Sequence, residues 1–411
     1  MIRGQRAGFA AAFAVPEFRA LWAAEAQSVV GDQLARVALS VVVYARTGSV
    51  GLTALSYAAM LLPALVSGPL LSGVADAFPR RRVMVVCALV QAALVALMAV
   101  PSTPMLALFA LIVTVQLVQA PYLAAQAATL PSVLTGDAYQ AAQAMRQITR
   151  QVGTLVGLAF GGMVIAIVGV SGALMIDAVT FLLAAVAIRL GVLSRPAAAA
   201  STDEARGAGI LPGITLIWRD PCLRSLTALA WLAGFAIVPE ALIVPFAASV
   251  GAGPTAIGWL LAVESAAMVL GAFLLVRFVP LERRLRLLGP LAVLTVVPLI
   301  AYAAGPGLAA GLVLLGLSGL FAAYQVTVSA TFMERVPDER RGQAYGIARS
   351  GLIAVQGLGV VAGGLVAELT GSVSTTIAIA GVLGVAAAIP AAISWQQANT
   401  AAERPLVGAT V

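Results

Sequence analysis

The chain has 411 residues, of which 61% are hydrophobic and 10% charged, whereas an ordinary soluble domain is roughly 25% charged. All 24 basic residues are arginine, and the chain contains no histidine. The lack of lysine excludes a Walker A loop, so this chain is not the ATP-hydrolysing part of a pump. The lack of histidine leaves Asp and Glu as the candidate proton carriers.

The apolar residues form runs of about 18 to 26, long enough for a helix to cross a hydrocarbon core roughly 30 Å thick. Short links rich in Gly and Pro, such as 251–254 and 305–307, separate the runs. The sequence therefore predicts an all-α membrane protein with twelve transmembrane helices. These cover about 20–45, 52–75, 83–100, 105–129, 146–168, 172–193, 223–248, 255–279, 287–304, 308–332, 346–368 and 374–395.

The arginines are distributed unequally across this predicted topology. Twenty-two of them fall on the side of the amino terminus, Arg46 falls on the other side, and Arg36 lies within a helix. By the positive-inside rule, this predicts a multi-pass protein of the cytoplasmic (inner) membrane with both termini in the cytoplasm. The net charge of +7 is thereby explained without a nucleic-acid partner. Cys87 and Cys222 lie in apolar surroundings, which indicates core packing rather than a disulfide framework or a metal site.

An internal repeat relates the two halves of the chain. At a shift of 202, residues 51–57 match 253–259, Arg81 and Arg82 match Arg283 and Arg284, and Tyr122 matches Tyr324. Residues 16–21 resemble 221–226 at a shift of 205. Because each half has six helices, both halves start on the same side of the membrane, so they form two six-helix bundles related by a parallel pseudo-two-fold axis. We predict an N-terminal bundle at 1–194, a cytoplasmic linker at 195–219, a C-terminal bundle at 220–411 and a cavity between the bundles.

One loop motif and one glycine series resemble motifs of the major facilitator superfamily, and the likeness to this family covers essentially the whole chain. Between helices 2 and 3, Gly73, Asp76 and three arginines resemble the loop motif of that family. The resemblance implies a conformational switch formed by Asp76, Arg80, Arg81 and Arg82, although a plain topogenic charge patch is the alternative. In helix 5 a glycine series resembles the antiporter motif of the family and recurs in helix 11, where close helix packing is the alternative role. These glycines are Gly153, Gly157, Gly161 and Gly162, with Gly359, Gly363 and Gly364 in the second half.

Charged residues inside predicted spans are candidates for function because a charge at bilayer depth costs about 2.5 to 3.5 kcal/mol. Helix 1 carries Glu25, Ser28, Asp32 and Arg36 at spacings of three and four, which predicts one face lining the cavity. Alternatively, Asp32 and Arg36 neutralise each other, and Glu25 reaches the lipid headgroups.

The second half and the remaining spans supply further candidates. Glu240 lies between Pro239 and Pro245, and Glu264 has no acidic counterpart in the repeat, which favours ligand or proton binding by both. Asp177 and Glu368 are expected at helix ends near the outer face. Neutral polar residues are expected either to contact substrate or to tie helices together. These are Gln116, Gln119, Tyr122, Tyr324, Gln325 and Gln356.

The family resemblance implies a secondary transporter that works by alternating access. Within the family, the residue patterns of helices 1 and 6 resemble the branch that exports drugs, macrolides and siderophores. We therefore expect proton-coupled efflux of an amphipathic small molecule by a monomer without cofactor or metal, and with protons and the lipid bilayer as partners. Uptake or facilitated transport of a metabolite is the first alternative. A membrane receptor or interaction protein that does not transport is the second. No paired nucleophile and base or cofactor motif indicates an enzyme.

Overall fold

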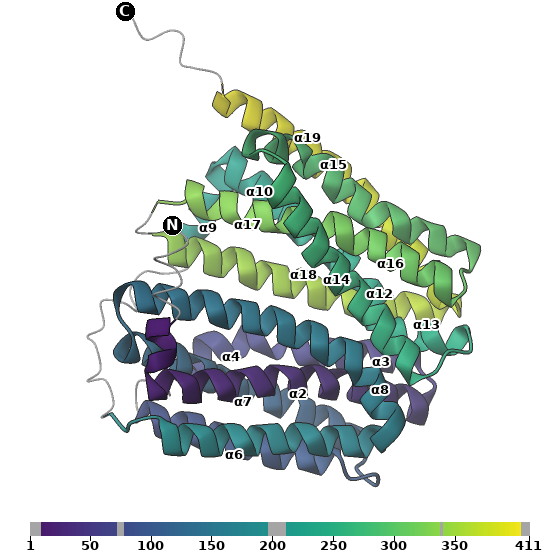
Figure 1. Ribbon diagram of the computed structural model, residues 1–411. Helices are drawn as coiled ribbons and strands as arrows, with labels where there is room; N and C mark the ends of the chain where they lie inside the picture. The colour runs from purple at the N-terminus through teal and green to yellow at the C-terminus, as the bar shows by residue number, and fades with distance from the viewer. Residues whose placement is uncertain (1–9, 72–77, 196–210, 338–339, 404–411) are drawn as a thin grey trace, which may run out of the picture. The chain divides into compact units, whose positions relative to one another are not determined.

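The computed structural model describes residues 10–71, 78–195, 211–337 and 340–403, and every regular element in these ranges is a helix (Figure 1). Asp76 and most of the predicted linker, residues 196–210, lie outside the described residues. Within those ranges, 11 helical stretches are long and apolar enough to cross a membrane. One of them, α8 (Gly136–Gly191), joins two spans across a break at Gly169. The prediction of an all-α chain with twelve spans is confirmed.

The helices form two compact units. Unit 1 comprises Met1–Gly48, Ala59–Thr202 and Gly253–Trp259, and unit 2 comprises Ser49–Ala58, Asp203–Ala252 and Leu260–Val411. Each unit thus includes one short segment from the other half of the sequence. The two exchanged segments contain the heptapeptides 51–57 and 253–259 that match each other in the repeat. The strongest local likeness between the halves therefore falls on the segments that they exchange.

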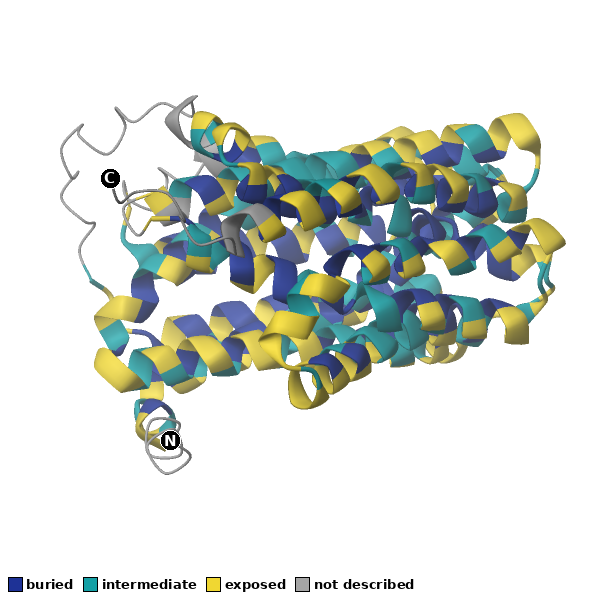
Figure 2. Ribbon diagram, turned by 90° about the horizontal axis from the view of Figure 1, so that it is seen from above, coloured by how far each residue is buried: buried dark blue, intermediate teal, exposed yellow. Residues whose placement is uncertain are grey.

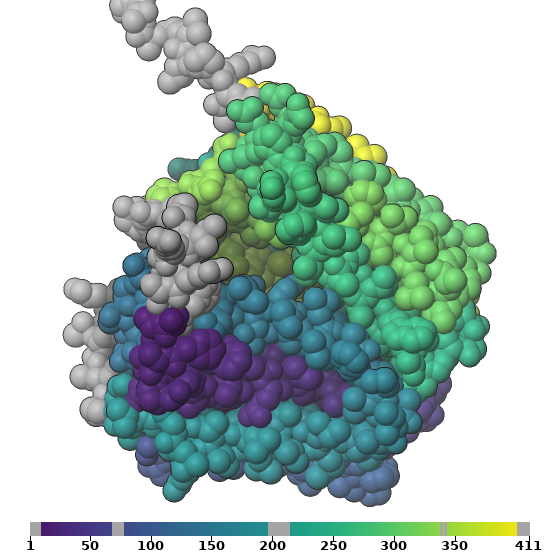
Figure 3. Space-filling view, in the orientation of Figure 1, coloured from purple at the N-terminus to yellow at the C-terminus, as the bar shows by residue number. Residues whose placement is uncertain are grey.

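Unit 1 is built around the pairing of α2 with α8, which lie side by side along their length (Figure 3). α6 packs against both α7 and α8. Pro63 ends α3 at Leu61 because proline has no amide hydrogen to continue the helix. The helices that contribute to unit 1 are α2 (Pro16–Thr47), α3 (Val50–Leu61), α4 (Pro63–Leu71), α6 (Arg80–Met98), α7 (Met105–Val133) and α8 (Gly136–Gly191).

Unit 2 differs from the sequence prediction in three places. The predicted span 223–248 is broken into four short helices. Pro239 and Pro245 remove backbone donors from its second half, whereas the first break, at Leu232, precedes both prolines. The predicted span 308–332 is interrupted at Ala323, and the end of the predicted linker forms a helix, α9 (Leu211–Arg219).

The remaining helices of unit 2 are α10 (Pro221–Trp231), α11 (Ala233–Ala236), α12 (Val238–Ala241), α13 (Ile243–Ser249), α14 (Pro254–Phe278), α15 (Leu281–Ile300), η2 (Ala301–Ala304), α16 (Leu308–Ala322), α17 (Tyr324–Arg335), α18 (Arg341–Thr370) and α19 (Val373–Glu403).

The break inside α8 extends the repeat beyond the residues that match in sequence. Gly169 has a φ of 73° and separates the fifth span from the sixth. Gly371, which lies 202 residues later, has a φ of 64° and separates α18 from α19. A side chain would strain the backbone at either position because L-residues rarely adopt positive φ. A glycine with positive φ therefore separates the last two spans in both units, although ψ is 174° at Gly169 and 11° at Gly371.

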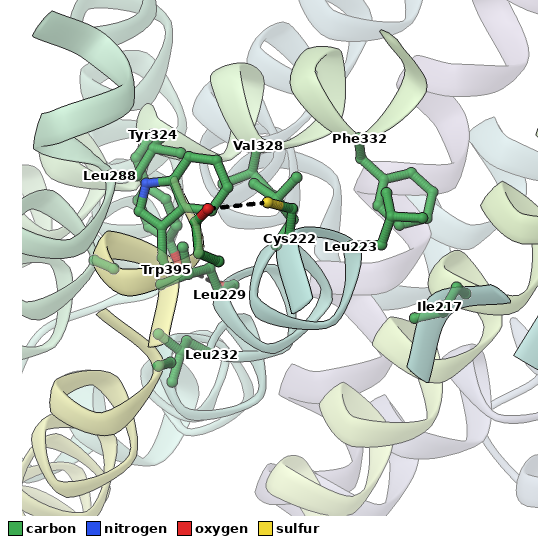
Figure 4. Close-up of a cluster of buried hydrophobic side chains, with 14 of the residues drawn as sticks. Ile217, Cys222, Leu223, Leu229, Leu232, Leu288, Tyr324, Val328, Phe332 and Trp395 are labelled. Carbon is green, nitrogen blue, oxygen red and sulfur yellow. Dashed lines mark hydrogen bonds between the residues drawn. The ribbon is translucent and has the colours of Figure 1, made fainter. Parts of the chain in front are cut away.

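Exposed side chains on these helices are largely apolar, as a lipid-facing surface requires. Leu106, Leu190 and Leu369 are 84%, 81% and 78% exposed, and buried residues follow the opposite helix faces (Figure 2). In unit 2 a cluster of buried side chains includes Trp395, Tyr324 and Phe332 (Figure 4). Trp395 Nε1 donates a hydrogen bond of 2.7 Å to the carbonyl oxygen of Leu285. Cys222 belongs to this cluster and Cys87 to a cluster in unit 1, so both cysteines are core residues.

Candidate functional site

Unit 1 contains a cavity of about 290 Å³ between α2, α3, α6, α7 and α8. Its walls combine apolar side chains, such as Leu39, Ile112 and Phe181, with a small set of polar groups. Such a mixture is typical of small-molecule sites, in which a few polar groups orient a largely apolar ligand. The polar and charged residues that line it are Asp32, Gln33, Arg36, Gln91, Gln116, Gln119 and Asp177.

Four of the predicted site residues therefore meet in this cavity: Asp32, Arg36, Gln116 and Gln119. Gln91, which the sequence did not single out, donates through Nε2 to Oε1 of Gln119. Arg36 donates through Nη1 to Oε1 of Gln33, at 3.2 Å.

Asp177 is a correction to the sequence analysis, which placed it at a helix end near the outer face. It lines the cavity of unit 1 and is only 1% exposed. Because the sixth span begins after Gly169, Asp177 lies eight residues into it, about 12 Å along the helix axis. Thr180 Oγ1 donates a hydrogen bond of 3.2 Å to Asp177 Oδ1. An acid inside the predicted apolar span 172–193 was the available signal.

Unit 2 contains a second cavity, of about 320 Å³. Five sequence candidates line it together: Glu240, Glu264, Tyr324, Gln325 and Gln356. Two further polar residues, Thr295 and Ser329, line the same space.

Tyr324 and Gln325 also support the broken seventh span. The Tyr324 hydroxyl donates to the carbonyl oxygen of Leu229 at 2.8 Å, and Gln325 Nε2 donates to that of Ala230 at 3.2 Å. Both carbonyls lie just before the end of α10 at Trp231. The two side chains therefore supply hydrogen bonds where the helix is interrupted, as a membrane interior requires.

Glu25 does not line the cavity of unit 1 and does not reach the headgroups, so both expectations for it were wrong. It is 7% exposed and pairs with Arg146 Nε, which is itself buried, and with Arg150 Nη1 at 2.8 Å. Gln126 Oε1 accepts a hydrogen bond of 2.8 Å from Arg146 Nη2. The acid thus joins α2 to α8 inside unit 1. Ser28 is buried as well and is not among the cavity residues.

Tyr122 also lies outside the cavity residues. It is buried in an apolar cluster, and its hydroxyl has no hydrogen-bond partner among the described residues.

The arginines after the predicted switch loop tie the start of α6 to neighbouring helices. Arg80 Nη1 donates to the carbonyl oxygen of Ala128 at 2.7 Å, and Arg81 Nη1 donates to that of Val192 at 3.2 Å. Arg82 is exposed. Since Asp76 lies outside the described residues, its relation to these arginines stays a prediction.

Three glycines of the fifth span, Gly153, Gly157 and Gly161, face α2. A methyl group on Gly157 would lie 2.7 Å from Gln33 Cβ, and one on Gly153 would lie 2.9 Å from Val29 Cγ1. Gly161 has more room, since its nearest neighbour would be 3.7 Å away. Gly162 faces the start of α14, where a methyl group would lie 2.9 Å from the amide nitrogen of Gly258.

The glycines of α18 repeat this arrangement in unit 2. A methyl group on Gly359 would overlap the carbonyl oxygen of Gly234, and one on Gly363 would lie 2.8 Å from Val238 Cγ1. Gly364 faces the start of α3, where a methyl group would lie 3.3 Å from Gly51 Cα. Equivalent glycines thus contact equivalent helices, including the two exchanged segments.

Comparisons with known proteins agree with this architecture. A family model described as Major Facilitator Superfamily matches residues 21–246 and 226–408. The Multidrug efflux pump Tap of Mycolicibacterium fortuitum is 27% identical over 341 residues, which cover 77% of this chain and 81% of Tap.

Solved structures extend the likeness to the fold. A bacterial homologue of the human lysosomal transporter Spinster, inward-facing and occupied, matches with a TM-score of 0.71 and 14% identity, covering 93% of this chain and 96% of its own. The nucleoside transporter NupG matches with a TM-score of 0.70 and 15% identity, covering 92% and 99%. At such low identity, these structures show a shared fold alone.

Proposed function

The chain belongs to the major facilitator superfamily and is a multi-pass membrane transporter, and from this premise we propose that it exports an amphipathic small molecule in exchange for protons. The observation that carries the proposal is the presence of two acids in the cavity of each unit. Asp32 and Asp177 line the cavity of unit 1, and Glu240 and Glu264 line that of unit 2. A carboxyl is the one side-chain type in this histidine-free chain that is suited to pick up and release a proton near neutral pH.

The shape and chemistry of the cavities support an amphipathic cargo. Both have largely apolar walls and a few amide, hydroxyl and carboxyl groups. Apolar walls of this kind accept many molecular outlines, whereas uptake of a sugar or nucleotide would favour a dense set of hydrogen-bonding groups. The direction of transport is supported by the likeness to Tap, which is named a multidrug efflux pump.

A proton gradient can supply the required energy. A protonmotive force of about 150 to 200 mV is worth roughly 3.5 to 4.6 kcal/mol for each charge moved. One exchanged proton would therefore sustain a gradient of about a thousandfold. In the proposed cycle, proton and substrate compete for a cavity carboxyl, and the carboxyl is exposed alternately to the two sides of the membrane, with both termini in the cytoplasm.

Proton flux in vesicles tests this function. The purified full-length protein is placed in lipid vesicles with an imposed pH gradient, and uptake of the fluorescent amphiphile ethidium is followed together with internal pH. We expect wild-type vesicles to accumulate ethidium while losing the gradient, and at least one of Asp32→Asn, Glu240→Gln and Glu264→Gln to lose both signals.

An exposed acid at the start of α8 supplies the matched control, since Asp137→Asn should leave both signals unchanged. Unchanged coupling in all three cavity variants would rule out these carboxyls as the coupling groups. Ethidium movement that is independent of the gradient would rule out proton-coupled export and would favour facilitated transport instead.

A further inference from the structure

Asp177 is a buried acid whose position depends on a glycine next to Asp32. A methyl group on Gly31 would overlap Asp177 Oδ1 and would lie 2.6 Å from Thr180 Oγ1. The carboxyl of Asp177 therefore rests against the backbone of α2 at the residue that precedes Asp32. Since both acids line one cavity, α8 and α2 bring two carboxyls into the same space.

One buried hydrogen-bond acceptor in this cavity lacks a donor in the part of the chain that the structure describes. Gln91 is 1% exposed and lines the same cavity, and its Oε1 has no hydrogen-bond partner among the described residues. Its Nε2 is directed to Gln119. An unpaired buried acceptor beside two carboxyls indicates a missing donor, because buried polar groups are costly when they are left unsatisfied.

The charged groups that line the cavity indicate that the missing hydrogen-bond donor is a carboxyl that has bound a proton. α2 contributes Asp32 and Arg36, α8 contributes Asp177, and the cavity residues of α3, α6 and α7 are uncharged. With both acids ionised, the cavity carries a net charge of −1. A single proton brings it to neutrality, and like charges in a shared site favour holding one proton between them.

We propose that Asp32 and Asp177 form one proton-binding site in unit 1, in which the two carboxyls share a single exchangeable proton. The proton arrives from water, forms an O–H bond on one carboxyl and is hydrogen-bonded by the other. It leaves to water when substrate enters the cavity. This inference rests on the proposed function and deepens it, since it names Asp177 as the second acid of the exchange site.

Carbodiimide labelling tests the pair without any transport measurement. Dicyclohexylcarbodiimide adds to a protonated carboxyl in apolar surroundings and leaves a stable acylurea, which peptide mass spectrometry locates. In the full-length wild type at about pH 7.5, we expect the labels at Asp32 and Asp177, counted on their own peptides, to sum to about one. In Asp177→Asn, the remaining acid and Arg36 balance each other, so labelling of Asp32 should fall by about fivefold or more. The reciprocal loss at Asp177 is expected in Asp32→Asn.

Three further variants protect the test from trivial outcomes. Asp137→Asn should not alter the labelling, and Asp177→Glu should retain a label at position 177. Arg36→Gln removes the balancing charge and should raise the summed labelling of Asp32 and Asp177 to about two. Each variant is compared by its elution profile in detergent, so that a misfolded sample is recognised.

The outcomes separate this inference from the proposed function. An unlabelled Asp177, together with equal labelling of Asp32 in wild type and Asp177→Asn, would overturn the shared site while leaving export through other carboxyls intact. Protection of both acids by ethidium would support the two proposals together. An intact labelled pair that no gradient or substrate affects would overturn proton-coupled exchange in the cavity, but not the proton-binding pair itself.

Discussion

In unit 1, the buried carboxylate of Glu25 joins α2 to Arg146 on α8, whereas unit 2 has alanines at both equivalent positions. Glu25 corresponds to Ala230 at the shift of 205, and Arg146 corresponds to Ala348 at the shift of 202. Both alanines pack against the apolar cluster of unit 2. The same helix pairing thus includes a buried ion pair in unit 1. At the equivalent positions of unit 2 it has apolar contacts and a hydrogen bond of 3.0 Å from Trp231 Nε1 to the carbonyl oxygen of Ala348.

The positions that stay alike are those set by the backbone. Gly157 and Gly359 allow the first helix of each unit to approach the fifth, and Gly169 and Gly371 turn the chain between the last two spans. The duplicated fold therefore depends on the close packing of two helices and on the turn between the last two spans. Buried charges differ between the units without changing this fold.

Breaking the ion pair of unit 1 should have the largest effect. Glu25→Gln leaves Arg146 buried without its counter-charge, which typically costs about 3 to 5 kcal/mol. We expect a matching loss in the free energy of unfolding, measured by denaturant or thermal unfolding in detergent. The double variant Glu25→Leu/Arg146→Met imitates the apolar solution of unit 2 and should recover much of the loss. A loss below about 1 kcal/mol in the single variant would show that water reaches the pair.

Filling the glycine contact of unit 2 should have the next largest effect. In Gly359→Ala, the new methyl group overlaps the carbonyl oxygen of Gly234, and such overpacking costs about 1 to 3 kcal/mol. Gly161→Ala, at a roomier position of the same series in unit 1, should be neutral or slightly stabilising, because alanine favours helix more than glycine does. Equal losses in both variants would show that the helix spacing is not set by these contacts.

Much of this fold follows from the sequence, for a physical reason. The length of each apolar run is set by the thickness of the bilayer, and the glycine spacing is set by how closely two helices pack. Both features can be recognised from residues that are near one another in the sequence. The twelve spans and the duplication were therefore predictable.

Side-chain partners were less predictable, because they depend on residues far apart in the chain. Glu25 meets Arg146 across 121 positions, and no local pattern distinguishes that pairing from a carboxyl that reaches the headgroups. Asp177 was misplaced because its burial depends on the helices that pack around it in the cavity of unit 1. The exchange of segments 49–58 and 253–259 between units was not predictable, because hydropathy reports the length of a helix and not its neighbours.

The two equivalent tyrosines sharpen the comparison on a smaller scale. Tyr324 donates its hydroxyl hydrogen to the Leu229 carbonyl oxygen, whereas the hydroxyl of Tyr122 has no partner among the described residues. Tyr324→Phe should therefore lower the free energy of unfolding by about 0.5 to 1.5 kcal/mol. Tyr122→Phe should be neutral or mildly stabilising, because it removes an unpaired polar atom. The reverse order in unfolding measurements would contradict the assigned hydrogen bonds.

The smallest effect is expected where the first span of each unit meets the end of its last span. In unit 1, Glu17 pairs with Arg195 at 2.8 Å and accepts the amide hydrogen of Leu193. At the equivalent position of unit 2, Cys222 Sγ approaches the carbonyl oxygen of Ala398 at 3.5 Å. Arg195 is 35% exposed, so Arg195→Gln should cost only about 0.2 to 1 kcal/mol in low salt.

High salt should abolish the stability difference between wild type and Arg195→Gln, because the Debye length falls to about 3 Å at 1 M ionic strength. Melting temperatures of wild type and Arg195→Gln, measured in detergent at low and high salt, should therefore converge as salt rises. Cys222→Ala provides the matched control in unit 2, since an uncharged contact predicts a shift that salt leaves unchanged. A salt-independent difference for Arg195→Gln would mean that its contribution comes from packing of the side-chain stem rather than from charge.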